Sequence, residues 1–167
     1  MTDQKPTDVQ PLGDTTATTP WKKARQQLAE SDYYWLTTNR PDKRPHTRPL
    51  LAVLTANSLY FSAGPTTRKS KNLVIDSHCS IATETDYFHF VVEGAARKVN
   101  DEGMLQNVAD AYATKYGWQV DVRDGAVYAD GAPTAGPPPY AVYEVAMATV
   151  FGFSLDESFT PTRWHFE

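Results

Sequence analysis

Two pairs of strand-like segments, each joined by a short polar turn, restrict the fold of this chain more than any other feature of its sequence. The first pair covers residues 46–54 and 57–62, and the second covers residues 78–84 and 88–99 with a turn at 85–87. Strands that follow one another through tight turns pair antiparallel, whereas parallel strands need long crossovers. The Gly-x-Gly-x-x-Gly and Walker patterns of nucleotide-binding α/β folds are absent from the sequence. We therefore predict a mainly antiparallel β-barrel with a few helices, not a doubly wound fold.

Helices and further strands are expected around these hairpins. A helix over residues 20–30 would take Thr19 as its N-cap and Pro20 as its first residue. A second helix over residues 101–116 would be capped by Asn100 and would present an apolar stripe. The other segments are predicted as strands over 33–38, 140–153 and 159–166, a short helix ending near 76, and a long loop over 117–139.

Two small residues stand out in the second hairpin. Gly94, which follows Glu93, interrupts an apolar strand, and this indicates a bulge or a close approach of two backbones. Cys79 is the single cysteine of the sequence, so an intrachain disulfide and a cysteine-rich zinc site are excluded. We predict that Cys79 packs as a small buried hydrophobic residue.

Composition bounds the partners and the number of domains. The 167 residues suffice for one domain with a real core, and the net charge of −4 argues against a general nucleic-acid binder. Residues 1–19 are polar and hold no apolar run that could serve as a signal peptide or a membrane span. We predict a flexible tail over 1–19, one folded domain over 20–167, no membrane or nucleic-acid partner, and a cytoplasmic protein.

The segment 62–73 has the features of a phosphate cradle at a strand-to-helix junction. Thr66 and Thr67 stand where a helix N-cap is expected, and three of the next four residues are cationic. Cations at a helix N-terminus are unfavourable unless an anion lies among them, because that end already carries partial positive charge. A solvated basic helix end is the alternative. Arg48, on the strand before the cradle strand, could add to the phosphate site, line a ring pocket or remain a surface arginine.

Side-chain catalytic motifs are missing from the sequence. The four histidines show no metal-binding helical spacing, and no Gly-x-Ser-x-Gly elbow accompanies them. We therefore predict no metal site and no catalytic side chain. The large aromatics Trp118 and Trp164 could stack on a planar ring or belong to the core. Acidic residues in turns and strands show no paired motif and are interpreted as solvated: Glu84, Asp86, Glu93, Asp121 and Asp124.

Four segments in order resemble a known family. They are residues 60–65 with 68–73, residues 90–99, residues 137–145, and residues 149–153 with 161–164. Together they are similar to the pyridoxamine 5′-phosphate oxidase-like split β-barrels, and in their C-terminal part to the actinobacterial flavin/deazaflavin oxidoreductases. The resemblance covers residues 33–166. No residues match the pyridoxamine phosphate substrate site of the true oxidases, so vitamin B6 oxidation is not expected.

The resemblance implies a split β-barrel of the FMN-binding type that forms a homodimer, with FMN or coenzyme F420 at the interface. It implies hydride transfer between the ring and a small organic substrate, a reaction in which the cofactor supplies the chemistry. A non-catalytic flavin or tetrapyrrole (haem) binding protein of the same fold is the alternative. The implied cofactor contacts are Thr67, Arg68 and Lys69 at the phosphate, His46, Thr47, Arg48, Pro49, Ser62 and Ala63 beside the ring, and Arg163 and Trp164 from the other subunit.

The acidic oligoglutamate tail of F420 gives a further expectation. Basic residues near the mouth of the groove could attract such a tail through long-range electrostatics. The candidates are Lys22, Lys23, Arg25, Arg40, Lys43 and Arg44.

Overall fold

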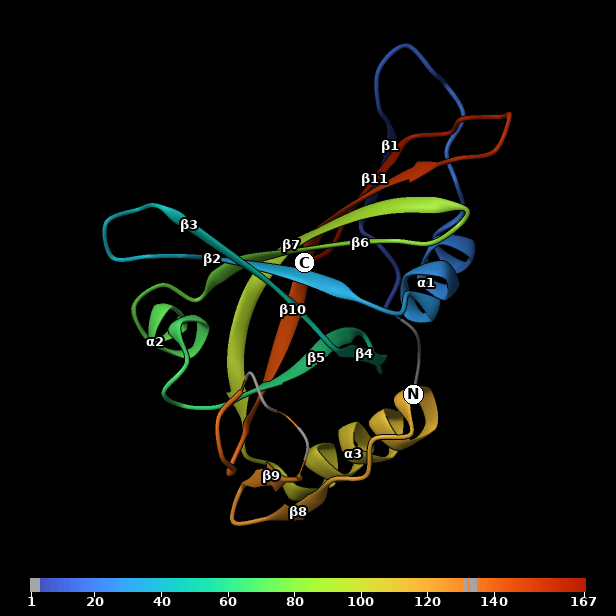
Figure 1. The fold of residues 1–167 in the computed structure, drawn as a ribbon. Helices are drawn as coiled ribbons and strands as arrows, with labels where there is room; N and C mark the ends of the chain where they lie inside the picture. The colour runs from blue at the N-terminus through green and yellow to red at the C-terminus, as the bar shows by residue number, and fades with distance from the viewer. Residues whose placement is uncertain (1–3, 131, 133–134) are drawn as a thin grey trace.

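A computed structural model describes residues 4–130, 132 and 135–167 of the chain (Figure 1). Its main sheet is antiparallel throughout and runs in the order β1-β11-β10-β7-β6-β2-β3. Off this path, β5 also pairs with β10, and β4 pairs with β5. The strands of this sheet are β1 Asp8–Pro11, β2 Tyr34–Asn39, β3 Pro45–Leu50, β4 Ala52–Thr55, β5 Ser58–Ala63, β6 His78–Glu84, β7 Phe88–Val99, β10 Ala141–Ser154 and β11 Thr162–His165.

The predicted antiparallel barrel is confirmed by this arrangement. Both predicted hairpins are present, although the first strand expected over 46–54 is divided into β3 and β4 at Leu51. The long loop expected over 117–139 contains a small separate hairpin, formed by β8 Asp121–Arg123 and β9 Ala126–Tyr128. The three helices of the described chain are α1 Trp21–Glu30, α2 Arg68–Ile75 and α3 Glu102–Tyr116.

Two hydrophobic clusters fill the inside of the molecule. The larger one lies within the barrel and contains Tyr34, Phe61, Phe90 and Trp164 among others. The smaller one lies where α3 packs against β4 and β5, and it includes Tyr112. In Figure 1, α3 covers one end of the barrel, while α2 lies beside the other end near the β2–β3 loop. Among the described residues, no helix is long and apolar enough to cross a membrane.

The helix starts show where local sequence rules succeed and fail. Thr67 caps α2 as predicted, because its side chain accepts a hydrogen bond from Ser70 N at 3.4 Å. Helix α3 is capped by Asp101 and not by Asn100, since the Asp101 carboxylate accepts from Met104 N at 2.8 Å. Thr19 does not cap α1 either: Thr19 is buried, and its hydroxyl lies 2.6 Å from the Thr160 hydroxyl.

Gly94 lies where two backbones come close together, as the sequence indicates. A Cβ added at Gly94 would overlap the carbonyl oxygen of Ala146 on the neighbouring strand β10. The irregularity in strand pairing is on β10, between Met147 and Thr149, and not on β7 itself. Only glycine fits at this crossing without displacing the β10 backbone.

The prediction of a flexible tail over 1–19 is wrong for the part that forms β1. Asp8–Pro11 pairs antiparallel with β11, and Thr7 N donates to His165 O at 2.8 Å. The residues that form these contacts are more than 150 positions apart in the chain, so no local pattern in the polar N-terminal segment predicts the contacts. Residues 1–3 lie outside the described residues.

Candidate functional site

The cradle between β5 and α2 is fixed by its own hydrogen bonds. The carbonyl oxygen of Gly64 accepts from the Thr67 hydroxyl at 2.8 Å, from the Ser70 hydroxyl at 2.9 Å and from Thr67 N at 3.1 Å. A Cβ on Gly64 would overlap the carbonyl oxygen of Ala135, so only glycine fits at this point. The hydroxyl proton of Thr67 is therefore used to build the turn. The backbone N–H groups of Arg68 and Lys69, in the first turn of α2, have no partner within the helix.

A buried histidine of β3 lies within the electrostatic influence of four cations, two of them in the first turn of α2. His46 is only 6% exposed, and its Nδ1 atom has no hydrogen-bond partner. Burial lowers the pKa of His46, and Arg48, Arg40, Lys69 and Arg68 lower it further in that order. Burial and the neighbouring Arg48 also lower the pKa of Lys69. These shifts show that positive charge is concentrated here.

The same cluster has no internal counter-ion. In the described part of the chain, no carboxylate forms an ion pair with any of these four cations. Like charges at such a site raise the free energy of the empty protein, and a bound anion removes that cost. Together with free N–H groups at a helix N-terminus, this donor set suits a phosphate.

The residues of β3 predicted to flank the ring lie in two environments. His46 is buried, whereas Thr47, Arg48 and Pro49 are exposed. The Thr47 hydroxyl lies 2.8 Å from the hydroxyl of Thr37 on β2. The guanidinium of Arg48 donates to its neighbour's carbonyl, Thr47 O, at 2.8 Å. The exposed side of β3 is therefore free to contact a ligand.

The other predicted ring neighbours face away from the cradle. The hydroxyl of Ser62 lies 3.1 Å from the Tyr112 hydroxyl of α3, and the side chain of Ala63 is fully buried. Their backbone remains beside the cradle, but their side chains are part of the barrel interior and of its contact with α3. Neither side chain is placed to contact a ligand at the cradle.

Arg163 and Trp164 are not brought to the cradle within one chain. Trp164 is 0% exposed, packs against Trp21 and donates its indole N–H to Thr19 O at 3.2 Å. Its ring is therefore a core element and does not reach a cofactor in this conformation. Arg163 lies on the outside of β11, where it donates to the Gln10 side chain at 2.6 Å.

A row of outward-facing side chains crosses the sheet between the two groups of predicted residues. The strand registers align Pro49, Trp35, Ala82, Val91, Phe151 and Arg163 across six neighbouring strands. Trp35, near one end of the row, is 51% exposed. Five strand spacings of about 4.8 Å place Pro49 and Arg163 about 24 Å apart along the sheet, too far to hold one ring.

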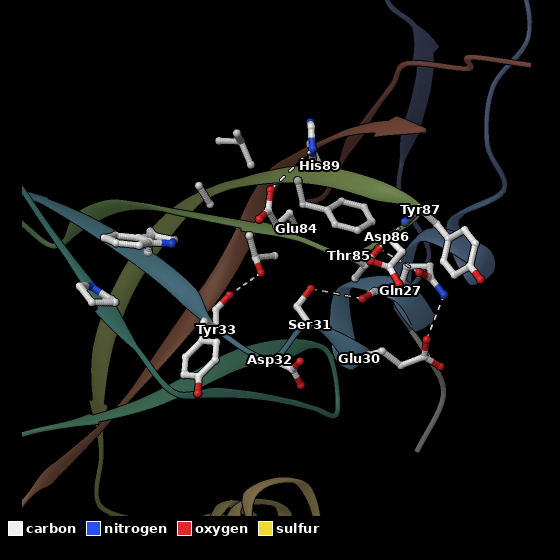
Figure 2. A pocket seen from close by; sticks show the side chains of 16 residues that line it. Gln27, Glu30, Ser31, Asp32, Tyr33, Glu84, Thr85, Asp86, Tyr87 and His89 are labelled. Carbon is white, nitrogen blue, oxygen red and sulfur yellow. Dashed lines mark hydrogen bonds and ion pairs between the residues drawn. The ribbon is translucent and has the colours of Figure 1, made fainter. Parts of the chain in front are cut away.

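A pocket of about 990 Å³ opens at the Trp35 end of this row (Figure 2). Pro49 and Trp35 contribute to one side of it, the end of α1 and residues 30–33 to another, and the β6–β7 turn around 84–87 to a third. The pocket is separate from the cradle, because none of residues 62–73 lines it, although β2 and β3 both extend from one toward the other. Within the described chain, no lysine or arginine lines it.

Comparison with known proteins places the chain in a family. Residues 20–154 match the model of the pyridoxamine 5′-phosphate oxidase family. The chain belongs to this family. The resemblance inferred from the sequence motifs is thereby confirmed. Among curated proteins, a search with the sequence finds no match.

Solved structures show the same fold at low sequence identity. A pyridoxamine 5′-phosphate oxidase-related, FMN-binding protein from Nostoc punctiforme is 15% identical, with a TM-score of 0.57 over 91% of this chain and 100% of that one. A putative 5-nitroimidazole antibiotic resistance protein from Bacteroides thetaiotaomicron is 13% identical, with a TM-score of 0.63 over 95% and 93%. A heme-binding protein from Mycobacterium smegmatis is 14% identical, with a TM-score of 0.62 over 83% of this chain and 55% of that one.

Two parts of the site were only partly anticipated from the sequence. Arg40, expected only as a contact for an acidic tail, joins the cation cluster from the β2–β3 loop, a position that only the folded register of β2 and β3 reveals. Trp35 and the acidic β6–β7 turn line a pocket, although the turn acids Glu84 and Asp86 were expected to be merely solvated. The sequence gives no signal for Trp35, because it stands in an apolar run with Tyr34 and Leu36, and only the burial of these two neighbours in the structure shows that Trp35 faces outward.

Proposed function

We propose that this protein is an oxidoreductase that binds FMN or coenzyme F420 and transfers a hydride between the cofactor ring and a small organic substrate. The observation that carries the proposal is the group of unpaired cations around His46 at the N-terminus of α2, in a family named for a phosphate-bearing substrate. When bound, the flavin or deazaflavin would supply the two-electron chemistry. The chain's own residues would bind and orient it.

The cradle would hold the phosphate through charge and backbone donors. Arg68 and Lys69 lie in the first turn of α2, the end of the helix whose free N–H groups favour an anion. Arg48 would approach from β3, and the unpartnered Nδ1 of His46 offers one more polar contact. Thr67 would act indirectly, because its hydroxyl proton already fixes the turn through Gly64 O.

A second copy of the chain would complete the ring site. The outward row from Pro49 to Arg163 ends in a predicted ring neighbour on each side. A two-fold axis through the middle of the row, near Ala82 and Val91, would place the Arg163 of one copy opposite the Pro49 of the other. The exposed Trp35 would be covered in the same step. This arrangement supports a homodimer in which Arg163, but not the buried Trp164, reaches the ring.

The basic residues considered for the F420 tail are not equivalent. Lys23 pairs with Asp156 at 3.5 Å, Arg44 pairs with Asp42 at 2.8 Å, and Arg25 donates to Ala56 O at 2.6 Å. These three are already engaged. Arg40 and Lys43 belong to the β2–β3 loop next to the cradle, and Arg40 already acts on His46. An oligoglutamate tail would therefore meet Arg40 and Lys43 first.

The proposal is tested by titrating the purified protein with FMN and with F420, read by fluorescence. Tight binding of either supports it, and binding of neither overturns it. Turnover with enones or quinones then separates an enzyme from a flavin or tetrapyrrole binding protein, the alternative kept open by the heme-binding neighbour.

A double substitution tests whether the cradle binds the phosphate of the cofactor. Replacing both Arg68→Ala and Lys69→Ala should weaken cofactor binding by about 1.5–3 kcal/mol for each charge-assisted hydrogen bond that the substitution removes. The matched control replaces Lys5 and Lys98, both exposed and outside the cradle, by alanine, which changes the net charge equally. Equal weakening in the two double variants would show that the cradle is not the phosphate site.

A further inference from the structure

The pocket beside Trp35 combines exposed aromatic rings with carboxylates. Tyr33, Trp35 and Tyr87 are 67%, 51% and 62% exposed, and all three line the pocket (Figure 2). Large aromatic side chains are usually buried, so three exposed ones around one cavity indicate a surface that contacts something. The acidic side chains in the same lining are Glu30, Asp32, Glu84 and Asp86.

The charge of these carboxylates is largely uncompensated within the pocket. Glu84 approaches only His89, at 3.7 Å, and Glu30 accepts hydrogen bonds from two glutamine amides, which are neutral. In the described chain, Asp86 forms no hydrogen bond or ion pair. Asp32 acts on Lys115, which is not part of the pocket lining. The local potential is therefore negative.

The cation cluster around His46 lies at the other end of the same strand. Strand β2, whose six residues Tyr34–Asn39 span roughly 20 Å, lies between the acidic pocket at Asp32 and Arg40 beside the cradle. The two ends therefore present opposite charge to any ligand lying along the outer face. An anion is favoured at the cradle and disfavoured at the pocket.

We propose that this pocket binds a planar organic cation, that is, a conjugated ring carrying a positively charged nitrogen. An exposed aromatic face in the pocket, such as that of Trp35, attracts a cation and stacks on a planar ring. The carboxylates neutralise its charge, and about 990 Å³ accommodates a small molecule. Because Pro49 lines the pocket and also belongs to the row that faces the proposed cofactor ring, the ligand would be the substrate; this role rests on the proposed function, whereas the binding does not.

The experiment compares three ligands of nearly the same shape by isothermal titration calorimetry. The probes are 1-methylquinolinium as the cation, quinoline as the neutral ring and quinoline-3-carboxylate as the anion. We expect the cation to bind about tenfold more tightly than quinoline, in line with a cation–π and carboxylate contribution, and the anion to show no binding. Equal binding of all three, or preference for the anion, would overturn the proposal.

Substitutions test whether the preference for the cation over the neutral ring comes from this pocket. Glu84→Gln with Asp86→Asn should reduce the cation-to-neutral ratio several-fold, and Trp35→Leu should weaken both ligands. The matched control, Glu157→Gln with Asp121→Asn, removes two exposed acids outside the pocket and should keep the full preference. A preference that survives the first double variant, or disappears in the control, contradicts the assignment.

The cradle variant separates this inference from the proposed function. Arg68→Ala with Lys69→Ala should abolish tight flavin binding while leaving 1-methylquinolinium binding unchanged. If neither flavin binds the wild-type protein but the cation does, the oxidoreductase proposal fails and the cation site stands. If flavin binds and the cation does not, the reverse holds.

Discussion

The inner and outer faces of the same strands carry side chains with different roles in this molecule. On β2, Tyr34 and Leu36 are buried while Trp35 between them is half exposed. On β11, Trp164 is fully buried and its neighbour Arg163 faces outward. Residues adjacent in a motif therefore need not act together, because successive side chains of a strand point to opposite faces.

The two faces also differ in how they use polar groups. Inside, polar side chains are bonded to each other or to backbone, as when the Tyr34 hydroxyl donates to Leu28 O at 2.7 Å. Outside, charges are left without partners at both ends of β2, basic at the cradle and acidic at the pocket. Inner residues should therefore determine stability, and outer residues should determine recognition.

The sharpest test of this difference replaces two neighbours on β11. Trp164→Ala should lower the free energy of unfolding by about 3–5 kcal/mol, because it removes a buried indole packed on Trp21 and Gly152. Arg163→Ala should change it by less than about 0.5 kcal/mol. Urea unfolding followed by circular dichroism measures both. Similar decreases in the two variants would contradict the division between the faces.

A smaller effect is expected on association. Trp35→Glu should leave the chain folded but weaken the proposed homodimer by about 2 kcal/mol or more, because a charge replaces a large apolar side chain that the partner copy would cover. Analytical ultracentrifugation measures the dissociation constant. Val74→Glu provides the control, since Val74 is 79% exposed on α2 and lies outside the outer row. A monomeric wild-type protein, or equal effects of both variants, would remove the outer face from the interface.

The sequence was sufficient to predict those structural features that depend on residues close together in the chain. Hairpin turns, the Thr67 cap and the close approach at Gly94 were all predicted, because each reflects a few consecutive residues. The pairing of β1 with β11 was not predicted, since a four-residue polar segment has no local pattern that indicates a partner strand at the other end of the chain.

The candidate site was predictable only in part for the same reason. The cradle is contiguous, so its residues could be recognised together. The direction of Trp164 could not be, because the alternation in β11 leaves open which face becomes the inside until β10 and α1 pack against it. The acidic pocket escaped notice because its walls come from α1, β2, β3 and the β6–β7 turn.

One partly buried charge, on Lys115, gives the region around α3 a titration near neutral pH. Lys115 of α3 donates to the Tyr34 hydroxyl at 2.8 Å and to Ala52 O at 3.2 Å, and its ammonium lies over the rings of Tyr34 and Tyr116. Burial lowers the pKa of Lys115 to about 8, although Asp32 acts in the opposite direction. Folding therefore favours the neutral amine compared with the unfolded chain.

The smallest expected effect follows from this shift. Between pH 8 and pH 10 the unfolded chain keeps the proton on Lys115 while the folded chain loses it, so stability should rise with pH. Relative to Lys115→Met, the gain should be on the order of 1 kcal/mol after solvent screening. Above pH 10 the trend should reverse, because burial raises the pKa of Tyr116 to about 12 and unfolding then releases its proton more easily. Urea unfolding across this range measures the difference, and a difference that does not change with pH would mean that Lys115 is solvated like the charges of the outer face.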